Sequence, residues 1–254
     1  GETPLWRTCV VTALFEEGTP REALLAALES IDPRVDLATA EFRDVEDQDW
    51  VRAWMDQFQP MAFGSRTWIV PWDHPLPEAA DVPNAAVVRL DPGLAFGTGT
   101  HPTTRMCLQW IAQGRGPHPL GRVLDYGCGS GILAIAAAMM GAQDVDAVDI
   151  DPAAVESSVL NAQANQVAIR CGLPDMTSGK YQTVLANILA RPLVSLAPEI
   201  ARMVARGGRV ILSGLLTHQE PQVRAAYAGQ GLTLVNRRRL NGWSTLVYAR
   251  QNNA

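Results

Sequence analysis

The sequence feature that most constrains this fold is a glycine-rich turn between a short apolar run and a helical pattern. The run Val123–Leu124 comes first, and three glycines follow Asp125 at alternate positions. Residues 132–140 then have a helical pattern. Glycine is needed in such a turn because the backbone must adopt a positive φ or approach a ligand closely, and a Cβ would obstruct both. The stretch predicts a strand, a tight turn and a helix start, with the turn at Gly127, Gly129 and Gly131.

A second acidic residue follows at a distance typical of a ribose-binding carboxylate. Residues 145–149 are typical of the next strand, and Asp149 comes 18 positions after Gly131, near the ~20-residue spacing of nucleotide sites. The dinucleotide fingerprint itself is not met, because Ile132 stands where its third glycine would be. No hydride-handling residue is evident, so a nicotinamide oxidoreductase is disfavoured. Such turns also cap ordinary βα units, but the acidic strand end makes a purely structural role the weaker interpretation.

The rest of the C-terminal region alternates strand and helix patterns, which predicts a mostly parallel sheet covered on both faces. In such sheets ligands bind beyond the carboxyl ends of the strands. Asp125, Asp149 and Asn187 all end predicted strands, so we expect them to converge on one crevice. Beyond Asp149 the predicted strands are 168–170, 183–187, 209–213, 232–235 and 244–248, and the predicted helices are 152–165, 192–203 and 219–230.

The first 84 residues are organised differently. Two strands, at 5–15 and 35–42, are predicted to flank a helix that opens at Thr19-Pro20-Arg-Glu22, where the threonine can cap, the proline suits the first position and the glutamate completes a capping box. A further helix at 47–58 leads into a proline-rich stretch with a short strand at 68–70. We therefore predict a small α+β domain at 1–46, a helix and Pro-rich interdomain linker at 47–84, and a third region at 85–254.

Residues 91–104 form a second unusual stretch, with three glycines, four threonines and no regular period. This composition indicates a mobile loop, and a lid over the neighbouring glycine turn explains it better than anion binding at the following helix N-terminus. Pro102 is expected to start that helix. His101 has no second His or Cys nearby, so we interpret it as a hydrogen-bonding residue that orders the loop, in preference to a base or ligand.

Composition excludes several classes of protein. The net charge is −5, which disfavours nonspecific nucleic-acid binding, and no apolar run reaches the roughly 18 residues that span a membrane. The four cysteines are scattered, without a C-x-x-C pair. Cys128, inside the glycine turn, is interpreted as a small buried thiol and not as a nucleophile. These features predict a reduced, cytoplasmic protein with no metal site and no signal peptide.

Two motifs together resemble the nucleotide-binding half of class I methyltransferases, which use S-adenosylmethionine. They are Leu124-Asp-x-Gly-x-Gly-x-Gly131 and Val148-Asp-Ile-Asp-Pro152. The resemblance implies that the glycine turn passes under the amino-acid part of the cofactor and that Asp149 accepts both ribose hydroxyls. It also implies that Asp125 helps to hold the turn or the cofactor's ammonium group.

Asn187-Ile-Leu-Ala190 resembles the fourth motif of amino methyltransferases, in which Asp or Asn precedes Pro-Pro-Tyr. The attacking nitrogen must point its lone pair at the methyl carbon, in line with the departing sulfur. The side-chain oxygen of Asn187 and a nearby backbone carbonyl can accept N–H bonds and aim that lone pair, and alignment can supply most of the acceleration. The motif's aromatic residue is missing here, which favours an aliphatic amine over a nucleobase or glutamine. Burial that lowers the pKa of a substrate lysine would help.

The motifs, the loop and the helix at 47–58 together resemble one family, the bacterial ribosomal protein L-eleven methyltransferases (PrmA), over nearly the whole chain. The resemblance implies a Rossmann-like, seven-stranded class I domain that trimethylates ε- and α-amino groups of a large-subunit ribosomal protein, which the N-terminal domain recognises. That domain is expected to be shortened, because family members usually carry an extra strand and helix before Gly1. The implied cofactor contacts are Phe96, Thr104, Asp125, Gly127, Gly129, Asp149, Ile150 and Asn187, and Asn187 is also the implied catalytic residue.

Three alternatives remain open at this point. The chain could be a class I methyltransferase that acts on RNA, although the acidic balance and the missing aromatic weigh against it. It could act on another protein, or it could bind the cofactor without transferring a methyl group. The sequence leaves open which amines are methylated, how many times, and the oligomeric state.

Overall fold

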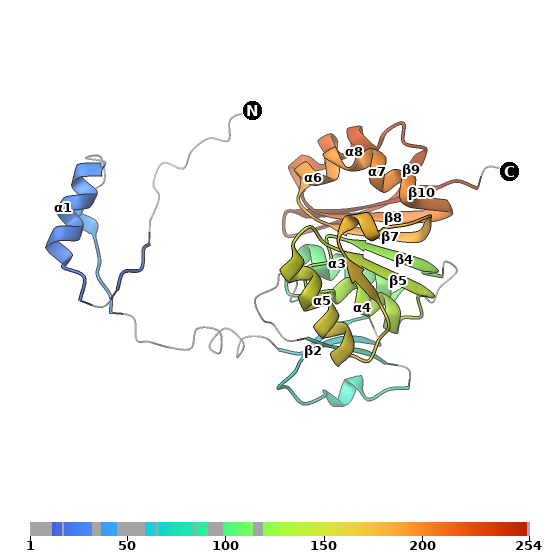
Figure 1. Cartoon of the computed structure of the whole chain (residues 1–254), viewed down its shortest axis with the longest axis horizontal. Helices are drawn as coiled ribbons and strands as arrows, with labels where there is room; N and C mark the ends of the chain where they lie inside the picture. The colour runs from blue at the N-terminus through green and yellow to red at the C-terminus, as the bar shows by residue number, and fades with distance from the viewer. Residues whose placement is uncertain are drawn as a thin grey trace. The chain divides into compact units, whose positions relative to one another are not determined.

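The computed structural model describes residues 12–16, 18–31, 37–44, 59–64, 66–83, 85–90, 99–113 and 119–252. The chain divides into two units, Gly1–Gln48 and Asp49–Ala254, and each is described by itself. Two predicted features, the helix at 47–58 and the part of the loop that contains Phe96, lie outside the described residues. Figure 1 shows both units.

The N-terminal unit contains one helix, α1 (Arg21–Ile31), among its described residues. Helix α1 begins at Arg21, one residue after the predicted first position, Pro20. The hydroxyl of Thr19, which was expected to cap the helix, donates to the carbonyl of Glu16 at 2.7 Å. The strand predicted at 35–42 is wrong over its described part, because Leu37–Thr39 form a 3-10 helix and residues 40–42 have no regular structure. A strand needs a partner for its backbone groups, and the described residues of this unit provide none. Residues 12–15 of the other predicted strand are also irregular.

A three-stranded sheet occupies much of the predicted linker. Strand β1 (Met61–Phe63) pairs antiparallel with β2 (Thr67–Pro71), which pairs parallel with β3 (Ala86–Leu90). The strand predicted at 68–70 is confirmed as part of β2, which has a partner strand on each side. Alternate side chains of these strands are buried in the same core as the helices that follow, among them Phe63, Ile69, Val88 and Leu90. A short 3-10 helix, Glu78–Ala80, connects β2 to β3.

A seven-stranded sheet forms the centre of the second unit, in the order β6-β5-β4-β7-β8-β10-β9. Five strands are parallel, and β10 is antiparallel to both β8 and β9. The predicted α/β class and the seven strands are confirmed. The bounds are β4 Arg122–Tyr126, β5 Asp144–Val148, β6 Arg170–Gly172, β7 Tyr181–Asn187, β8 Val204–Leu216, β9 Leu232–Leu240 and β10 Trp243–Arg250.

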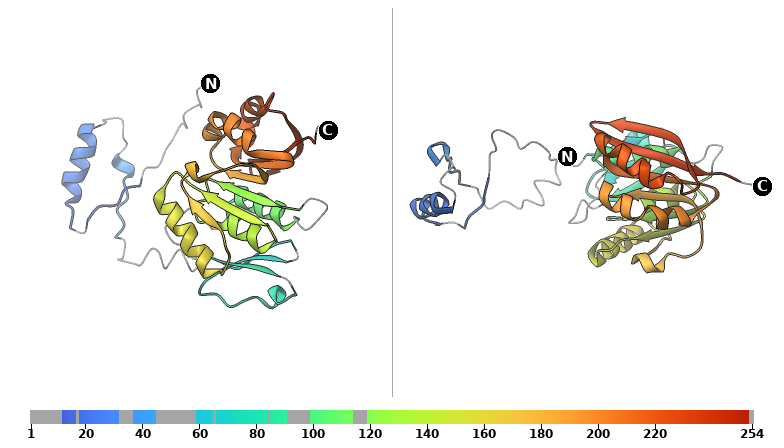
Figure 2. Two further views of the ribbon diagram at one scale, coloured as in Figure 1. Left: turned by 45° about the vertical axis from the view of Figure 1, so that its right-hand side comes forward. Right: turned by 90° about the horizontal axis from the view of Figure 1, so that it is seen from above.

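Helices cover both faces of this sheet, so alternate residues of one strand enter two different cores. Leu185 of β7 lies in a core with residues of α3, α4 and α5, whereas its neighbour Val184 lies in a core with residues of α6, α7 and α8. Figure 1 labels these helices, and Figure 2 shows the same arrangement from two other directions. Their bounds are α3 Pro102–Ala112, α4 Ile132–Met139, α5 Pro152–Ala164, α6 Ala190–Ser195, α7 Ala197–Met203 and α8 Glu220–Tyr227.

Several predicted elements differ in their boundaries, most clearly around the start of β8. The helix predicted at 192–203 is two short helices, α6 and α7, divided at Leu196. Pro198 has no N–H to bond the carbonyl four residues earlier, so the helix ends and restarts there. Strand β8 begins directly after α7, five residues before the predicted strand at 209–213. Short 3-10 helices at Pro174–Met176 and Thr217–Gln219 complete the unit.

Candidate active site

The glycine turn between β4 and α4 has the backbone that its sequence predicts. Gly127, Gly129 and Gly131 have φ values of 80°, 54° and 78°. The N–H of Gly127 donates to the carbonyl of Val148 at 2.7 Å, which ties the turn to the end of β5. A Cβ at position 131 would lie 2.9 Å from the hydroxyl of Ser158. The turn is thus fixed by two neighbouring elements, and side chains are excluded from it.

Asp125 lies in β4, just before this turn, and is completely buried (0% exposed). One carboxylate oxygen, Oδ2, accepts the backbone N–H of Ala134 at 3.1 Å. The other, Oδ1, has no hydrogen-bond partner among the residues that the structure describes. Burial raises the pKa of this carboxyl to about 7, and the nearby charge of Asp149 adds to the shift. The site therefore contains a buried acceptor that would be stabilised by a cationic donor.

Asp149 follows β5 and joins the glycine turn. Its Oδ2 accepts the N–H of Gly129 at 2.9 Å and its Oδ1 accepts the N–H of Asp151 at 3.1 Å. A carboxylate has about four lone-pair positions, so capacity for two hydroxyl donors remains. The next residue, Ile150, exposes 82% of its surface. An exposed apolar side chain beside a fixed carboxylate suits a ligand with a flat apolar ring and adjacent hydroxyls.

Asn187 ends β7, the strand on the other side of β4. Its Nδ2 donates to the hydroxyl of Thr104 at 3.2 Å, and Thr104 is itself buried on α3. The side-chain oxygen, Oδ1, is buried and, within the described ranges, has no partner. The Thr104 contact fixes the amide so that a free acceptor remains for an N–H donor.

The structure brings Asp125, Asp149 and Asn187 to one edge of the sheet. Strands β5, β4 and β7 are adjacent and parallel, so their carboxyl ends meet there. Contacts also join the residues that follow these strands: Gly129 bonds to Asp149, and the side chain of Ile188 lies against Gly127. Of the predicted site residues, only Phe96 falls outside the described residues.

This geometry can be compared with known proteins. The family model of ribosomal protein L11 methyltransferase (PrmA) matches residues 1–251. The chain belongs to the ribosomal protein L11 methyltransferase family. It is 55% identical over 233 residues to the ribosomal protein L11 methyltransferase of Stenotrophomonas maltophilia (strain K279a), covering 90% of this chain and 76% of that protein. The corresponding protein of Xylella fastidiosa (strain 9a5c) is 52% identical over 233 residues, again covering 90% and 76% of the two chains.

A solved structure supports the same family. The ribosomal protein L11 methylase from Lactobacillus delbrueckii subsp. bulgaricus is 34% identical, with a TM-score of 0.68, and covers 77% of this chain and 100% of that one. The seven-stranded sheet, in which β10 is antiparallel to both of its neighbours, is therefore the Rossmann-like class I methyltransferase fold.

In this L11 methyltransferase family member, His101 caps the start of α3. The ring Nδ1 lies 2.7 Å from the hydroxyl of Thr103 and accepts the N–H of Thr103 at 3.4 Å, which makes His101 the N-cap of α3. The ring also meets that of Trp243 edge-on, with centroids 4.6 Å apart. The hydrogen-bonding role predicted for His101 is confirmed, and most of the loop that it was expected to order lies outside the described residues.

Sequence reasoning missed two contributors to this edge, Ile188 and Gly214. Ile188 lies against Gly127, and Gly214, near the end of β8, approaches the backbone of Ile188. A signal was available, because Gly214 directly follows the predicted strand 209–213, which ends at the same edge as Asn187. The interpretation of Cys128 as a buried thiol is confirmed: its sulfur lies 3.3 Å from the hydroxyl of Ser158, and burial raises the pKa of the thiol.

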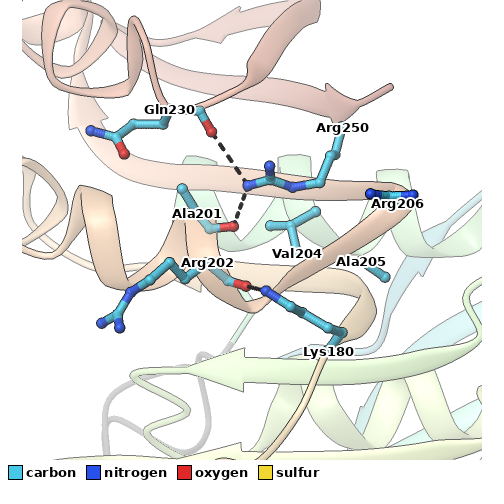
Figure 3. A pocket seen from close by; sticks show the side chains of 8 residues that line it. All are labelled: Lys180, Ala201, Arg202, Val204, Ala205, Arg206, Gln230 and Arg250. Atoms are coloured by element: carbon cyan, nitrogen blue, oxygen red, sulfur yellow. Dashed lines mark hydrogen bonds between the residues drawn. The ribbon is translucent and has the colours of Figure 1, made fainter. Parts of the chain in front are cut away.

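A pocket of about 500 Å³ lies at the opposite edge of the sheet, where β7 and β8 begin and β10 ends. Figure 3 shows two of its cationic side chains, Lys180 and Arg250, bonded to backbone carbonyls. Lys180 donates to the carbonyl of Arg202, and Arg250 donates to that of Ala201 at 2.6 Å. Cations at the last turn of a helix satisfy its free carbonyls and its dipole. These contacts cap α7, and Asp125 and Asn187 are not among the residues that line the pocket.

Two negative findings apply to the described ranges only. No group of three or more His, Cys, Asp or Glu there could hold a metal ion. No helix there combines the length and the apolar character needed to cross a lipid bilayer.

Proposed function

We propose that the protein transfers methyl groups from S-adenosylmethionine to amino groups of ribosomal protein L11. One observation carries the proposal. Two buried side-chain oxygens at the same edge of the sheet, Oδ1 of Asp125 and Oδ1 of Asn187, have no partner within the described part of the chain. Buried acceptors without partners are costly, and a cationic cofactor and an amine substrate would supply the missing donors. Membership of the L11 methyltransferase family names the reaction.

The residues around the glycine turn fit this cofactor. Asp125 would pair with its ammonium group, Asp149 would accept the ribose hydroxyls, and the exposed side chain of Ile150 would cover the adenine. Gly127 and Gly129 would let the cofactor approach the backbone. S-adenosylmethionine supplies a methyl group on an already activated sulfonium sulfur. Thr104 positions Asn187 through their hydrogen bond, and Phe96 and its loop are proposed to close over the site.

Asn187 is proposed to orient the attacking amine. Its Oδ1 would accept an N–H of the substrate, and the fixed amide would hold the nitrogen lone pair in line with the methyl group. Such alignment replaces a bimolecular encounter by a preorganised step. The residue three positions on is Ala190, with no aromatic ring to stack on a planar group. This favours aliphatic amines, which are lysine ε-amino groups and the N-terminal α-amino group.

The region 1–46 is proposed to recognise the ribosomal protein, and the site at Asp125 and Asn187 to perform the transfer. A ribosomal-protein substrate places the reaction in the cytoplasm. Direct binding of nucleic acid is not required by this scheme, and RNA as the acceptor is a competing outcome of the test below.

The test is incubation of the purified protein with S-adenosylmethionine and purified L11, followed by mass spectrometry of L11. We expect mass increases in steps of one methyl group on lysine and N-terminal amines. A parallel incubation with ribosomal RNA and radiolabelled donor examines the competing acceptor. Label in RNA and not in L11 would contradict the proposed substrate, and binding of S-adenosylhomocysteine without transfer to either would reduce the protein to a cofactor-binding module.

A further inference from the structure

Ile188, the residue after Asn187, is enclosed between two glycines from different strand ends. An ideal Cβ at Gly127 would lie 2.2 Å from the Cγ2 of Ile188. An ideal Cβ at Gly214 would lie 2.3 Å from the Ile188 carbonyl oxygen and 2.7 Å from its carbonyl carbon. Each glycine also has a positive φ, 80° at Gly127 and 84° at Gly214. The loop after β7 therefore occupies space that exists only because both positions lack a side chain.

The two contacts differ in kind. At Gly127 the neighbour is a side-chain methyl group, which a smaller residue at 188 would remove. At Gly214 the neighbour is backbone, which no substitution at 188 can remove. Relief of a clash at 214 would require the Ile188 peptide to move by on the order of 1 Å, because a contact of 2.3 Å lies well inside the ~3.5 Å at which carbon atoms attract.

The position of Gly214 is set by a β-bulge. Between Leu212↔Leu246 and Leu215↔Ser244, two residues of β8, Ser213 and Gly214, oppose the single residue Thr245 of β10. The hydroxyl of Ser213 lies 2.7 Å from that of Thr245 and donates to the carbonyl of Thr103 at 3.3 Å. Bulges bend a strand and re-aim its neighbours, and they are frequent beside active sites. This bulge directs the Gly214 backbone toward the Asn187 loop.

We propose that Gly214 is a positioning residue for methyl transfer: with Gly127, it fixes the Ile188 peptide and, one residue earlier, the acceptor oxygen of Asn187. The proposal rests on the function proposed above. Misplacement of a reacting geometry by about 1 Å can cost on the order of 100-fold in rate. The three atoms nearest to an added Cβ at Gly214 all belong to Ile188 and none to the proposed cofactor residues Asp125 and Asp149, so we expect its effect on transfer and not on cofactor binding.

The experiment compares Gly214→Ala with Gly229→Ala, a matched control. Gly229 also has a positive φ, 79°, but nothing lies within 4 Å of its ideal Cβ. An alanine would adopt a similar positive φ at both positions, but only at Gly214 would its methyl group meet Ile188. We expect kcat toward purified L11 to fall about 100-fold in Gly214→Ala and to stay within threefold in Gly229→Ala. The Kd for S-adenosylhomocysteine should stay within threefold in both.

A kcat for Gly214→Ala that falls no further than that of Gly229→Ala would overturn the proposal. So would a parallel loss of S-adenosylhomocysteine affinity and kcat, since Gly214 would then act on cofactor binding. Failure of the wild-type protein to methylate L11 would instead refute the proposed function. The wild-type assay therefore distinguishes that failure from a failure of the Gly214 proposal.

A second comparison begins at Gly127, and this part of it does not depend on the folding of Gly214→Ala. Gly127→Ala should weaken S-adenosylhomocysteine binding, and adding Ile188→Ala should recover at least threefold of that loss, because it removes the methyl group in the way. The same Ile188→Ala change should recover no kcat in Gly214→Ala, where the contact is backbone. Absence of rescue at position 127 would show that Ile188 is not held as proposed.

Discussion

Two aspartates on adjacent strands, Asp125 of β4 and Asp146 of β5, are both completely buried (0% exposed), yet their surroundings are opposite. Asp146 is the middle residue of β5, and both of its oxygens are bonded to side chains of the first residues of β4, β6 and β7. Asp125 lies at the carboxyl ends, and only one of its oxygens has a partner in the described structure. The donors to Asp146 are Tyr181 Oη at 2.6 Å, Arg170 at 2.7 Å and Arg122 at 3.0 Å.

The comparison separates structural chemistry from ligand chemistry within one sheet. A buried charge that the fold needs is paired within the fold, because an unpaired one costs several kcal/mol. A buried acceptor without a partner is unusual and calls for an explanation, such as a ligand that completes it. The Asp146 cluster is therefore complete by itself, whereas the proposed cofactor and substrate would complete the free oxygens of Asp125 and Asn187.

The largest effect is expected from loss of the Asp146 cluster. Asp146→Ala leaves two arginines and a tyrosine hydroxyl without their shared partner, and we expect the free energy of unfolding to fall by about 3–5 kcal/mol. Urea unfolding measures it. Asp144→Ala, at the exposed start of the same strand, is the matched control and should change stability by less than about 0.5 kcal/mol. Equal losses in both variants would contradict the structural role of the Asp146 cluster.

At the carboxyl end of β7, Asn187→Ala should remove the group that orients the amine substrate. The fold and the contacts to the cofactor should remain. We expect kcat for L11 methylation to fall by about 10²–10³-fold, the usual cost of removing one preorganised hydrogen-bonding group. The affinity for S-adenosylhomocysteine, measured by calorimetry, should change by less than about threefold. Asn236→Ala, on the exposed edge strand β9, serves as the control. A kcat close to wild type in Asn187→Ala would remove Asn187 from the mechanism.

A smaller effect is expected at Asp149. Removal of its carboxylate should weaken S-adenosylhomocysteine binding by about 10–100-fold, because hydrogen bonds to a charged group contribute about 1.5–3 kcal/mol. Asp151→Ala is a close control, since Asp151 caps α5 through the N–H of Ala153 at 2.9 Å. That variant should lose about 1 kcal/mol of stability and keep its affinity. If the two variants bind equally, the ribose interpretation of Asp149 is wrong.

The smallest effect concerns pH. Because burial raises the pKa of Asp125 to about 7, the carboxylate that would pair with the cofactor's ammonium is mostly protonated at pH 6 and mostly ionised at pH 8. We expect the affinity for S-adenosylhomocysteine to rise about tenfold between these values and to level off above them. Asp125→Asn should flatten this profile. A profile that is already flat in the wild-type protein would exclude Asp125 from pairing with the ammonium group.

Stability of the ligand-free protein should change in the opposite direction. The folded-state pKa of Asp125, about 7, lies above the ordinary value near 4, so the folded chain holds this proton more tightly than the unfolded chain. Its contribution to stability is complete below about pH 4 and is lost as the pH rises through about 7. Thermal melting of wild type and Asp125→Asn across this window measures the difference.

The strongest sequence predictions were those in which one local rule sufficed. The three alternate glycines required a turn with positive φ, Pro102 marked a helix start, and Asn187 ended an apolar strand. Each rule depends on neighbouring residues alone, and each is found in the structure. Parallel strands then carry Asp125, Asp149 and Asn187 to one edge by topology, so the location of the site could also be predicted.

The sequence is less informative where pairing between distant segments decides the structure. The strand predicted at 68–70 is present, but the prolines of the stretch 60–84 do not indicate that it pairs with Met61–Phe63 on one side and with Ala86–Leu90 on the other. Pro71 stands at the end of its strand, where a missing N–H is tolerated. Composition within one window cannot show that a strand 19 residues away supplies the partner for Thr67.

By itself, the sequence determined the class of fold, the glycine turn, the strand-end side chains and the family, because backbone conformation and strand topology follow from local residue types and their order. Only the tertiary structure decided which of two buried aspartates is paired and which is open, and which glycine admits the Ile188 loop. Those properties depend on contacts between residues from 24 to more than 80 positions apart, such as Arg122 with Asp146 and Thr104 with Asn187. No local pattern encodes distances of that kind.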